Sequence, residues 1–338
     1  MTIRIGLIGA GRMGEVFAHH LAFSIPEAHF TAVADTRPEV AKQVAVRYGA
    51  ERFYSHYAKL LSQDDIDAVV IVTPTNTHER VIIDAANAGK HIFSEKPLSL
   101  TLQGCDAAIA AVEAAGVKLQ VGFMRRYDPA YLAAKQKIDD GVIGNPVMFK
   151  SVGRDPQRTS IEFAKRENSG GLIMDMGIHD FDLARWLMGS EVERVYSEGE
   201  CLVFPELKDV NDIDNAVISL KFENGAVGAV DVSRNAVYGY DVRTEIMGSE
   251  GSLYIGREQQ TPLLVKTRTG ITHDTVPYFM ERFGEAYATE IKDFINCLEK
   301  DKTPAITGED GRKATAIGLA ATISLDEYRP VELSELEQ

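Results

Sequence analysis

The chain has 338 residues, of which 45% are hydrophobic and 25% charged, a composition typical of a globular protein with about two domains. Its formal net charge of −14 argues against nucleic acid or an anionic membrane as the main partner, because both bind clustered Lys and Arg. The sequence shows no apolar run of membrane-spanning length and no basic targeting segment, so we expect a cytoplasmic protein with a small-molecule ligand. Three widely separated cysteines, Cys105, Cys201 and Cys297, favour packing roles over a disulfide framework or a zinc site.

The first elements of the chain predict a dinucleotide-binding unit. An apolar run at residues 3–8 is typical of a buried parallel strand, and it leads into the motif Gly9-Ala10-Gly11-Arg12-Met13-Gly14. Gly9 would permit the tight turn, Gly11 would let the backbone approach a pyrophosphate, and Gly14 would allow close helix packing. The helical pattern that follows would present its N-terminus to the anion.

A second strand, at residues 30–34, ends at Asp35, where a carboxylate would meet the ribose hydroxyls of the cofactor. Asp35 favours NAD over NADP because a carboxylate would repel a 2′-phosphate, although Arg37 could tolerate that phosphate. Another role for Asp35 is to cap the helix that begins at Pro38. The predicted cofactor contacts in this part of the chain are Gly9, Gly11, Arg12, Met13, Gly14, Asp35 and Arg37.

The alternation of strands and helices continues to residue 122 and predicts an α/β fold, a six-stranded, doubly wound, Rossmann-like parallel sheet. We place the domain boundary near Phe123, which gives a dinucleotide-binding domain at 1–123 and a second domain at 124–338. The expected helices are 38–48, 58–61, 79–89 and 102–115, the further strands are 68–72, 91–94 and 118–122, and a short connection runs through Phe53-Tyr54.

Two loops follow strands of this sheet at its carboxyl edge, where open α/β sheets bind ligands. The segment Thr73-Pro74-Thr75-Asn76-Thr77-His78 should contact the cofactor, although a strand-to-helix turn with a threonine or asparagine cap explains its composition equally well. The segment Ser94-Glu95-Lys96-Pro97 follows the next strand and brings Lys96 to the same edge. The predicted cofactor contacts in these loops are Thr73, Pro74, Asn76, His78, Glu95 and Lys96.

Beyond residue 123 the pattern predicts an α+β domain with one large, open, mostly antiparallel sheet. Asn224-Gly225 is a typical hairpin turn within it. A polar loop is expected at 155–168. The expected helices are 131–139, 171–188, 282–300 and 308–325, and the expected strands are 147–153, 195–203, 215–222, 226–232, 241–247, 251–255 and 263–267.

The run that begins at Gly170-Gly171 carries Asp175 and His179 four residues apart, which places both on one face of a helix. A histidine is the usual proton acceptor near neutral pH, and a carboxylate on its other nitrogen would fix its tautomer and raise its basicity. A structural Asp/His pair explains the spacing equally well. A metal site of His179, Asp180 and Asp182 is disfavoured, because carboxylates at that spacing diverge around a helix, and we predict no metal.

The glycine motif with Asp35, the segment Glu95-Lys96-Pro97 and the run from Gly170-Gly171 to His179 resemble the Gfo/Idh/MocA family of nucleotide-dependent oxidoreductases. The segment from Gly122 to Asp128, which contains Arg125, Arg126 and Tyr127, is similar to the inositol 2-dehydrogenase branch of that family. The resemblance covers essentially the whole chain. It implies NAD-dependent oxidation of a cyclic polyol, myo-inositol or scyllo-inositol, to the 2-keto product. It also implies a cis bond before Pro97 and a homodimer or tetramer formed through the sheet of the second domain.

The resemblance further implies that Lys96, Asp175 and His179 form the catalytic group, with the nicotinamide ring between the domains. His179 is the expected base, Asp175 would orient its imidazole, and Lys96 would stabilise alkoxide character on the reacting oxygen. The roles of Lys96 and His179 could be exchanged, because burial beside a cationic nicotinamide lowers the pKa of a lysine. The expected substrate contacts are Lys96, Arg125, Arg126, Tyr127, Asp155, Asp175, His179 and Tyr238.

Two other functions stay open at this point. One is a dehydrogenase of a pyranose sugar or another cyclic polyol, because sugar dehydrogenases of this family share most of the motifs. The other is a non-catalytic regulator that senses the dinucleotide on the same fold. The presence of Lys96, Asp175 and His179 argues against the regulator, because a sensor has no use for a proton path.

Overall fold

The computed structural model describes residues 2–337, and the chain forms two compact units. The first unit runs to Tyr127 and also includes Glu285–Thr315, while the second comprises Asp128–Gly284 and the chain from Ala316 onward. This division differs from the contiguous ranges that we predicted, because two late helices contribute to the first unit. Periodicity locates a helix in the chain, but it does not tell which sheet the helix covers.

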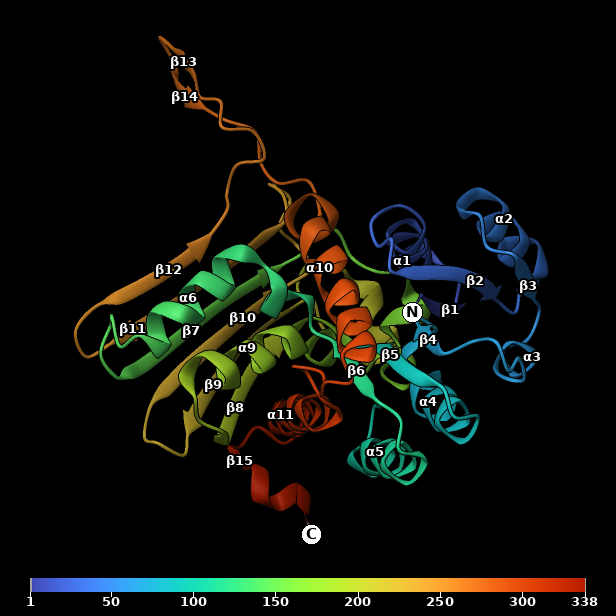
Figure 1. Cartoon of the computed structure of the whole chain (residues 1–338). Helices are drawn as coiled ribbons and strands as arrows, with labels where there is room; N and C mark the ends of the chain where they lie inside the picture. Colours follow the sequence, from blue (N-terminus) through green and yellow to red (C-terminus); the bar gives the residue numbers. More distant parts are fainter. Residues whose placement is uncertain (1, 338) are drawn as a thin grey trace. The chain divides into compact units, whose positions relative to one another are not determined.

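Within the described residues, the first unit is a six-stranded parallel sheet in the order β3-β2-β1-β4-β5-β6 (Figure 1). β1 and β4 run side by side with Ile8 opposite Ile71, and the strand order reverses between them, so this is the topological switch point. The predicted Rossmann-like sheet is confirmed, and the segment that we expected to be a connection is the short strand β3. The strands are β1 (Ile3–Ile8), β2 (Ala28–Ala34), β3 (Arg52–Tyr54), β4 (Ala68–Ile71), β5 (His91–Glu95) and β6 (Leu119–Gly122).

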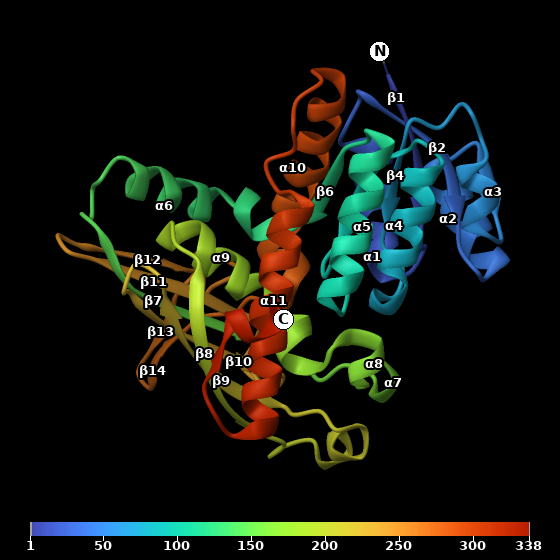
Figure 2. The same ribbon diagram turned by 90° about the horizontal axis from the view of Figure 1, so that it is seen from below.

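Helices cover both faces of this sheet, which explains its continuous apolar strands. α1 and α2 lie together on one face, and α4 and α5 lie together on the other (Figure 1 and Figure 2). α10 completes the cover, since Tyr287 contacts Phe17 and Phe294 contacts Phe93 at centroid distances of 6.1 and 6.0 Å. The helices are α1 (Arg12–Phe23), α2 (Pro38–Tyr48), α3 (Tyr57–Leu61), α4 (His78–Asn87), α5 (Leu102–Ala115), α10 (Phe279–Glu299) and the first part of α11 (Gly308–Glu327).

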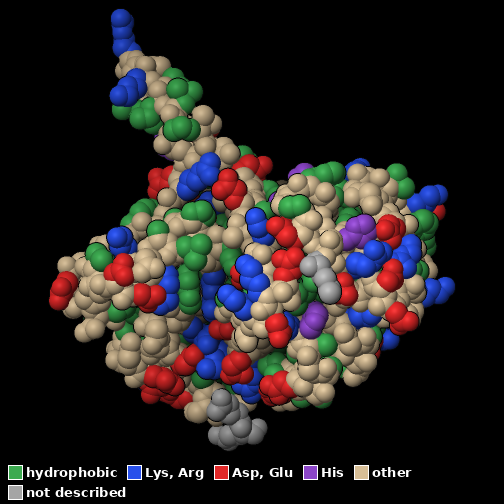
Figure 3. All heavy atoms as spheres, viewed as in Figure 1, with side chains coloured by type: hydrophobic (Ala, Val, Ile, Leu, Met, Phe, Trp, Pro, Cys, Tyr) green, Lys and Arg blue, Asp and Glu red, His purple; other side chains and the backbone are tan. Residues whose placement is uncertain are grey.

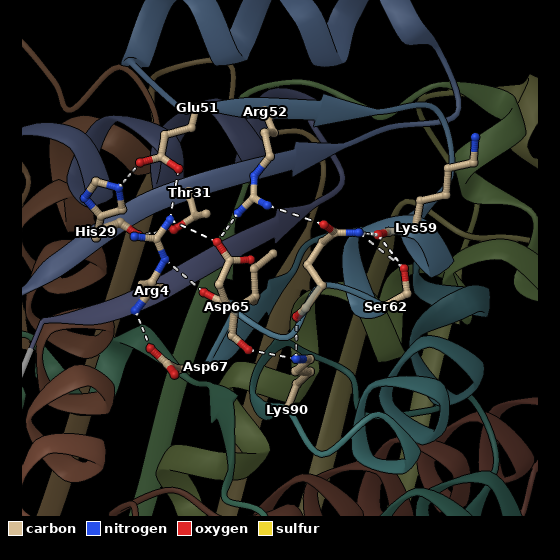
Figure 4. Close-up of polar contacts among 12 residues, drawn as sticks. Arg4, His29, Thr31, Glu51, Arg52, Lys59, Ser62, Asp65, Asp67 and Lys90 are labelled. Atoms are coloured by element: carbon tan, nitrogen blue, oxygen red, sulfur yellow. Dashed lines mark hydrogen bonds and ion pairs between the residues drawn. The ribbon is translucent and has the colours of Figure 1, made fainter.

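A network of ion pairs ties the amino ends of the strands together (Figure 4). Arg4, in β1, contacts Glu51 at 2.9 Å and Asp65 at 3.2 Å, and Arg52, at the start of β3, contacts Asp65 at 2.7 Å. Lys90, before β5, donates to two backbone carbonyls of the segment before β4 at 2.7 and 2.9 Å. These contacts close the end of the sheet opposite the glycine motif, and the loops that we expect to bind the ligand lie at the other end, after the carboxyl ends of the strands.

The second unit forms, in the part of the chain that the structure describes, a seven-stranded sheet in the order β12-β11-β7-β10-β9-β8-β15 (Figure 1). β7 and β10 pair in parallel and the other neighbours pair antiparallel, so the predicted mostly antiparallel sheet is confirmed. The strands are β7 (Pro146–Arg154), β8 (Val192–Glu200), β9 (Asn215–Phe222), β10 (Val227–Ser233), β11 (Asp241–Gly248), β12 (Ser252–Gly256) and β15 (Val331–Glu332).

Two predictions for this unit were wrong. The expected strand at 263–267 does not join the large sheet; it is β13 (Val265–Thr267), which pairs with β14 (Gly270–Thr272) as a separate hairpin. The expected polar loop at 155–168 contains two short helices, α7 (Ile161–Ala164) and α8 (Arg166–Ser169). α7 begins after Ser160, whose hydroxyl accepts a hydrogen bond from a backbone N–H at 3.2 Å. A single capped turn is too short to show a helical period.

One face of the large sheet is covered by α6 (Pro129–Asp139), α9 (Ile178–Met188) and the later part of α11 (Figure 1 and Figure 2). Ser151 of β7 donates to Asp180 of α9 at 2.6 Å, on the covered face. Within the described residues, no layer covers the opposite face, where Val217, Val227, Met247 and Tyr254 are between 41% and 62% exposed. We call this the uncovered face. In the range 2–337, no helix is long and apolar enough to cross a membrane.

Candidate active site

The glycine motif forms the turn between β1 and α1. Gly9 has a φ of +99°, and a Cβ there would lie 2.6 Å from the carbonyl oxygen of Val72. A Cβ on Gly14 would lie 2.2 Å from the carbonyl oxygen of Gly9, so α1 packs directly on the turn. A Cβ on Gly11 would meet nothing within 4 Å, and Gly11 is the N-cap of α1, with no side chain capping the helix. This open space at the N-terminus of a helix that its N-cap side chain does not cap fits the pyrophosphate of a dinucleotide.

Asp35 follows β2 and holds the glycine turn. Its carboxylate accepts hydrogen bonds from the backbone N–H of Ala10 at 2.9 Å, and from the backbone N–H and Nε of Arg37 at 2.9 and 3.0 Å. Burial alone would raise the pKa of Asp35, but the hydrogen bonds from Arg37 and Ala10 outweigh burial and hold the pKa below its usual range. Arg37 is the N-cap of α2, so Asp35 does not cap that helix. Arg37 therefore balances the charge of the residue that we expect to read the ribose.

His78 joins the two loops at the carboxyl edge. Its side chain is 2% exposed, with Nδ1 2.8 Å from the carbonyl oxygen of Pro97 and Nε2 2.9 Å from that of Thr73. Burial is the largest influence on its pKa and lowers it. The peptide between Lys96 and Pro97 is cis, which confirms what the family resemblance implied. His78 therefore holds the two loops together, and the contacts of both loops with a cofactor stay predictions.

Glu95, the residue before Lys96 in the chain, forms a buried pair of carboxyl groups with Glu290. Glu95 is 9% exposed and Glu290, on α10, is fully buried. Burial raises the pKa of Glu95 to about 7, against the opposing charge of Lys96, and burial and the charge of Glu95 raise the pKa of Glu290 well above its usual value. Neither carboxylate oxygen of Glu290 has a hydrogen-bond partner among the described residues. The sequence did not point to Glu290, because an acid on an amphipathic helix is normally a surface residue.

The segment Arg125-Arg126-Tyr127 forms a 3-10 turn (Met124–Tyr127) after β6. Arg126 Nη2 pairs with Asp310 at 3.0 Å, and the hydroxyl of Tyr127 donates to Asp293 at 2.8 Å. Both acids belong to the same unit as the turn, so these side chains fix α10 and α11 to the first unit. The contacts of this segment with a substrate stay predictions.

In the second unit, Gly170 and Gly171 allow an aspartate to cap the helix that follows. Their φ angles are +80° and +78°, and a Cβ on Gly171 would lie 2.8 Å from Oδ1 of Asp212. That oxygen accepts a hydrogen bond from the backbone N–H of Leu172 at 2.9 Å. Burial raises the pKa of Asp212, and the Leu172 N–H and the charge of Arg234 oppose this effect. The glycine pair thus positions the start of the segment that carries Asp175 and His179.

Asp175 lies in a π-helical turn (Ile173–Gly177) that leads directly into α9. Such turns are frequent at functional sites, and they change the four-residue spacing that we assumed for a regular α-helix. Asp175 accepts a hydrogen bond from Nη2 of Arg234 at 3.1 Å, and Arg234 is only 2% exposed. His179 is the second residue of α9 and is 9% exposed.

Arg234 was missed by the sequence analysis. Its position, directly after β10 in a mostly antiparallel sheet, gave no signal, because a charged residue after such a strand is normally on the surface. The guanidinium donates to Asp175, and its positive charge also opposes the rise in the pKa of Asp212. Arg234 therefore belongs to the positioning of the candidate catalytic aspartate.

The last two predicted substrate contacts lie near the ends of β7 and β10. The hydroxyl of Tyr238 donates to Asp241 at 2.8 Å and accepts from Arg154 at 3.2 Å. Tyr238 is 50% exposed and lines a cavity of about 680 Å³ that includes residues of the uncovered face. The backbone N–H of Asp155 donates to Ser233 at 2.8 Å. The substrate contacts of Asp155 and Tyr238 stay predictions.

Among residues 2–337, no group of three or more His, Cys, Asp or Glu side chains is arranged to hold a metal ion. Asp180 and Asp182, which we considered as ligands, are at most 1% exposed, and Asp180 accepts the hydrogen bond from Ser151 that fixes α9 to β7. The three cysteines are buried free thiols, in line with the packing roles that we predicted.

Comparison with known proteins extends the likeness to both units. A family model described as "Oxidoreductase family, NAD-binding Rossmann fold" matches residues 3–123, and one described as "Oxidoreductase family, C-terminal alpha/beta domain" matches residues 135–333. The chain is 41% identical over 331 residues to the scyllo-inositol 2-dehydrogenase (NAD(+)) of Bacillus subtilis (strain 168). This match covers 98% of this chain and 96% of the relative. It is 39% identical over 335 residues to the myo-inositol 2-dehydrogenase of Thermotoga maritima, which covers 99% of each chain.

A solved structure shows the same likeness in three dimensions. The scyllo-inositol dehydrogenase from Lactobacillus casei, with bound cofactor NAD(H) and scyllo-inositol, superposes with a TM-score of 0.94. It is 33% identical, and the match covers 99% of this chain and 100% of the other. The predicted oxidoreductase class and the NAD cofactor are confirmed. With both of its units matched, this chain belongs to the Gfo/Idh/MocA family of oxidoreductases and carries that family's NAD-binding Rossmann fold.

Proposed function

We propose that this protein is an NAD-dependent inositol 2-dehydrogenase that oxidises myo-inositol or scyllo-inositol to the 2-keto product. The observation that carries the proposal is the full-length likeness, at 39% and 41% identity, to relatives named for these two substrates. Bound NAD would supply the hydride acceptor. The residues that would hold it are those of the glycine turn, where the open space at Gly11 fits a pyrophosphate, and Asp35 at the end of β2.

We further propose that Lys96, Asp175 and His179 perform the proton chemistry. Oxidation of a ring hydroxyl removes a hydride from carbon and a proton from oxygen, so the protein must supply a base for that proton. An imidazole nitrogen of His179 accepts the proton, and Nζ of Lys96 donates a hydrogen bond to the reacting oxygen as its negative charge develops. Asp175, held by the buried Arg234, orients the imidazole. The exchanged assignment, with Lys96 as the base, is the alternative that a pH profile decides.

Two substitutions test this group. Lys96→Met and His179→Ala should leave NAD binding unchanged and lower turnover by about 10²- to 10⁴-fold, the usual size of an acid–base contribution. In the variant that lacks the base, the fall in turnover at low pH, which reports protonation of that base, should also disappear. Full turnover by either variant would remove that residue from the mechanism.

The substrate is tested by following NADH formation with inositol isomers and common aldoses. We expect NADH with myo-inositol or scyllo-inositol. A signal with aldoses alone would favour a pyranose dehydrogenase, and NAD binding without turnover of any substrate would favour a dinucleotide-sensing regulator. The polar contacts proposed for the substrate, at Arg125, Arg126, Tyr127, Asp155 and Tyr238, would discriminate between isomers, because an unpaired buried donor costs about 1–3 kcal/mol.

We also propose that the protein is a cytoplasmic homodimer or homotetramer that assembles through the uncovered face. An exposed face with Val217, Val227, Met247 and Tyr254 at 41–62% exposure is typical of a surface that a partner covers. The three free thiols suit a reducing compartment. Light scattering should give a mass of two or four chains, and the mass of one chain would contradict the assembly.

A further inference from the structure

The hairpin of β13 and β14 forms an arm that leaves the second unit. Figure 1 shows it at the end of an extended segment after β12, and Figure 3 shows the same segment as a projection from the surface. We define the arm as residues 261–275, every one of which is exposed. In this structure the hairpin therefore leaves its side chains open to solvent, while His273 and Thr275 at the base of the arm lie beside Gly239 and Tyr240.

The arm has the composition of a segment that needs a surface to pack on. Two strands of three residues each, without a third strand or a covering helix, are marginally stable in water. Four large apolar side chains point to solvent: Leu263 is 60% exposed, Leu264 47%, Val265 48% and Ile271 64%. A hairpin with this much exposed apolar surface marks an interaction site.

The tip of the arm is basic. Lys266 is the middle residue of β13 and Arg268 lies in the turn that follows it, and Figure 3 shows blue side chains at and near the end of the projection. Asp274, the acid of the arm, is at its base, where it accepts a hydrogen bond from the backbone N–H of Thr261 at 3.1 Å. The arm thus combines the apolar side chains of Leu263, Leu264, Val265 and Ile271, which we call its apolar shaft, with two cations. The net charge of the whole chain is −14.

A groove of the same unit has the complementary character. This is the cavity of about 680 Å³ described above, whose exposed apolar residues include Leu202 at 73% and Tyr328 at 80%. Its acids include Glu198 and Glu200 of β8. Glu198 accepts from the neutral hydroxyl of a tyrosine, and Glu200 is 3.7 Å from an exposed lysine, a surface pair of small energy. Both carboxylates can therefore receive a cation.

We propose that the arm of one copy docks into this groove on a second copy of the chain. The apolar shaft would cover the exposed rim, and Lys266 and Arg268 would pair with Glu198 and Glu200. Because one chain carries both the arm and the groove, two copies related by a two-fold axis can each give and receive an arm, which closes the assembly. This inference rests on the homo-oligomer proposed above and names a contact that forms it.

Charge reversal tests the pairing. Lys266→Glu with Arg268→Glu should raise the dissociation constant between subunits about tenfold or more, measured by sedimentation at low salt. Glu198→Lys with Glu200→Lys should weaken association similarly. Combination of all four changes in one chain should restore association, because every pair regains opposite charges. Failure of the combined variant to associate better than either reversed form would overturn the pairing.

Two controls keep this result specific. Lys42→Glu with Lys59→Glu makes the same change in charge on exposed helices of the first unit and should leave the dissociation constant unchanged. In a second variant, a short Gly-Ser link replaces residues 261–275, with folding checked by circular dichroism. Its mass should fall to that of a smaller assembly. An unchanged mass would refute the arm and leave the oligomer standing, whereas a wild-type monomer would refute both, and neither outcome bears on dehydrogenase activity.

Discussion

Glu290→Gln tests whether the buried carboxyl pair holds a proton in the folded protein. Glu290 is fully buried with both oxygens unpartnered among residues 2–337, and burial with the charge of Glu95 raises its pKa well above 4.5. A carboxyl group of this kind keeps its proton when folded but loses it in the unfolded chain above about pH 4.5. The unfolded state is therefore favoured increasingly as the pH rises, by about 1.4 kcal/mol per pH unit for each such group.

The substitution replaces this carboxyl by an amide of nearly the same shape that does not titrate. Glu290→Gln should therefore be more stable than the wild type at neutral pH, and its advantage should grow by about 2–3 kcal/mol between about pH 5 and pH 7. Glu95, whose pKa rises to about 7, adds a similar slope to both proteins over this range. Urea unfolding at several pH values measures the difference.

Glu113→Gln, on the exposed side of α5, is the matched control and should leave the pH dependence as it is in the wild type. Parallel curves for wild type and Glu290→Gln would refute the reasoning. They would mean that Glu290 is ionised in the folded protein and has a counter-charge.

Three further substitutions probe the first unit's loops and the second unit's packing. Gly14→Ala puts a Cβ 2.2 Å from the carbonyl oxygen of Gly9, so α1 must move away from the turn; calorimetry should show NAD binding weakened at least about tenfold. Asp35→Ser releases Arg37 to meet a 2′-phosphate and should move the ratio of kcat/KM values towards NADP, while an unchanged ratio would mean that the ribose is read elsewhere. Asp214→Asn loses a carboxylate that accepts from three successive backbone N–H groups at 2.7–2.9 Å, and should cost about 1.5–3 kcal/mol in urea unfolding at neutral pH. Burial opposes ionisation of Asp214, yet those N–H groups hold its pKa below the usual range, so the difference should shrink as the pH falls below about 4.

Elements with local determinants were predicted well from the sequence. The helix expected at 38–48 is α2, because Pro38 starts it and Gly49, with a φ of +77°, ends it. The glycine turn was predicted because a Cβ at Gly9 or Gly14 would clash with nearby backbone, and the clashing atoms belong to the turn itself or to the residue that follows β4. These determinants lie within a few residues of the structure that they specify.

Features that depend on distant partners were not predicted. Arg234 meets Asp175 across 59 residues of chain, and Glu290 gains its unusual pKa from burial against the first unit's sheet. The strand expected at 263–267 does form, but the period of a strand does not reveal which sheet it joins. Likewise, the amphipathic pattern of α10 did not show that most of this helix belongs to the nucleotide-binding unit.

The chain passes between its two units three times, after Tyr127, after Gly284 and after Thr315, and the last two passages occur inside α10 and α11. A chain cut at residue 123 would therefore leave the Rossmann sheet without the aromatic cover that Tyr287 and Phe294 supply. Exchange of the second domain between relatives as one block would also replace this cover with a sequence evolved against another sheet. Because α10 and α11 each contribute residues to both units, we expect that neither unit can be exchanged by a single cut in the chain, although each has its own sheet.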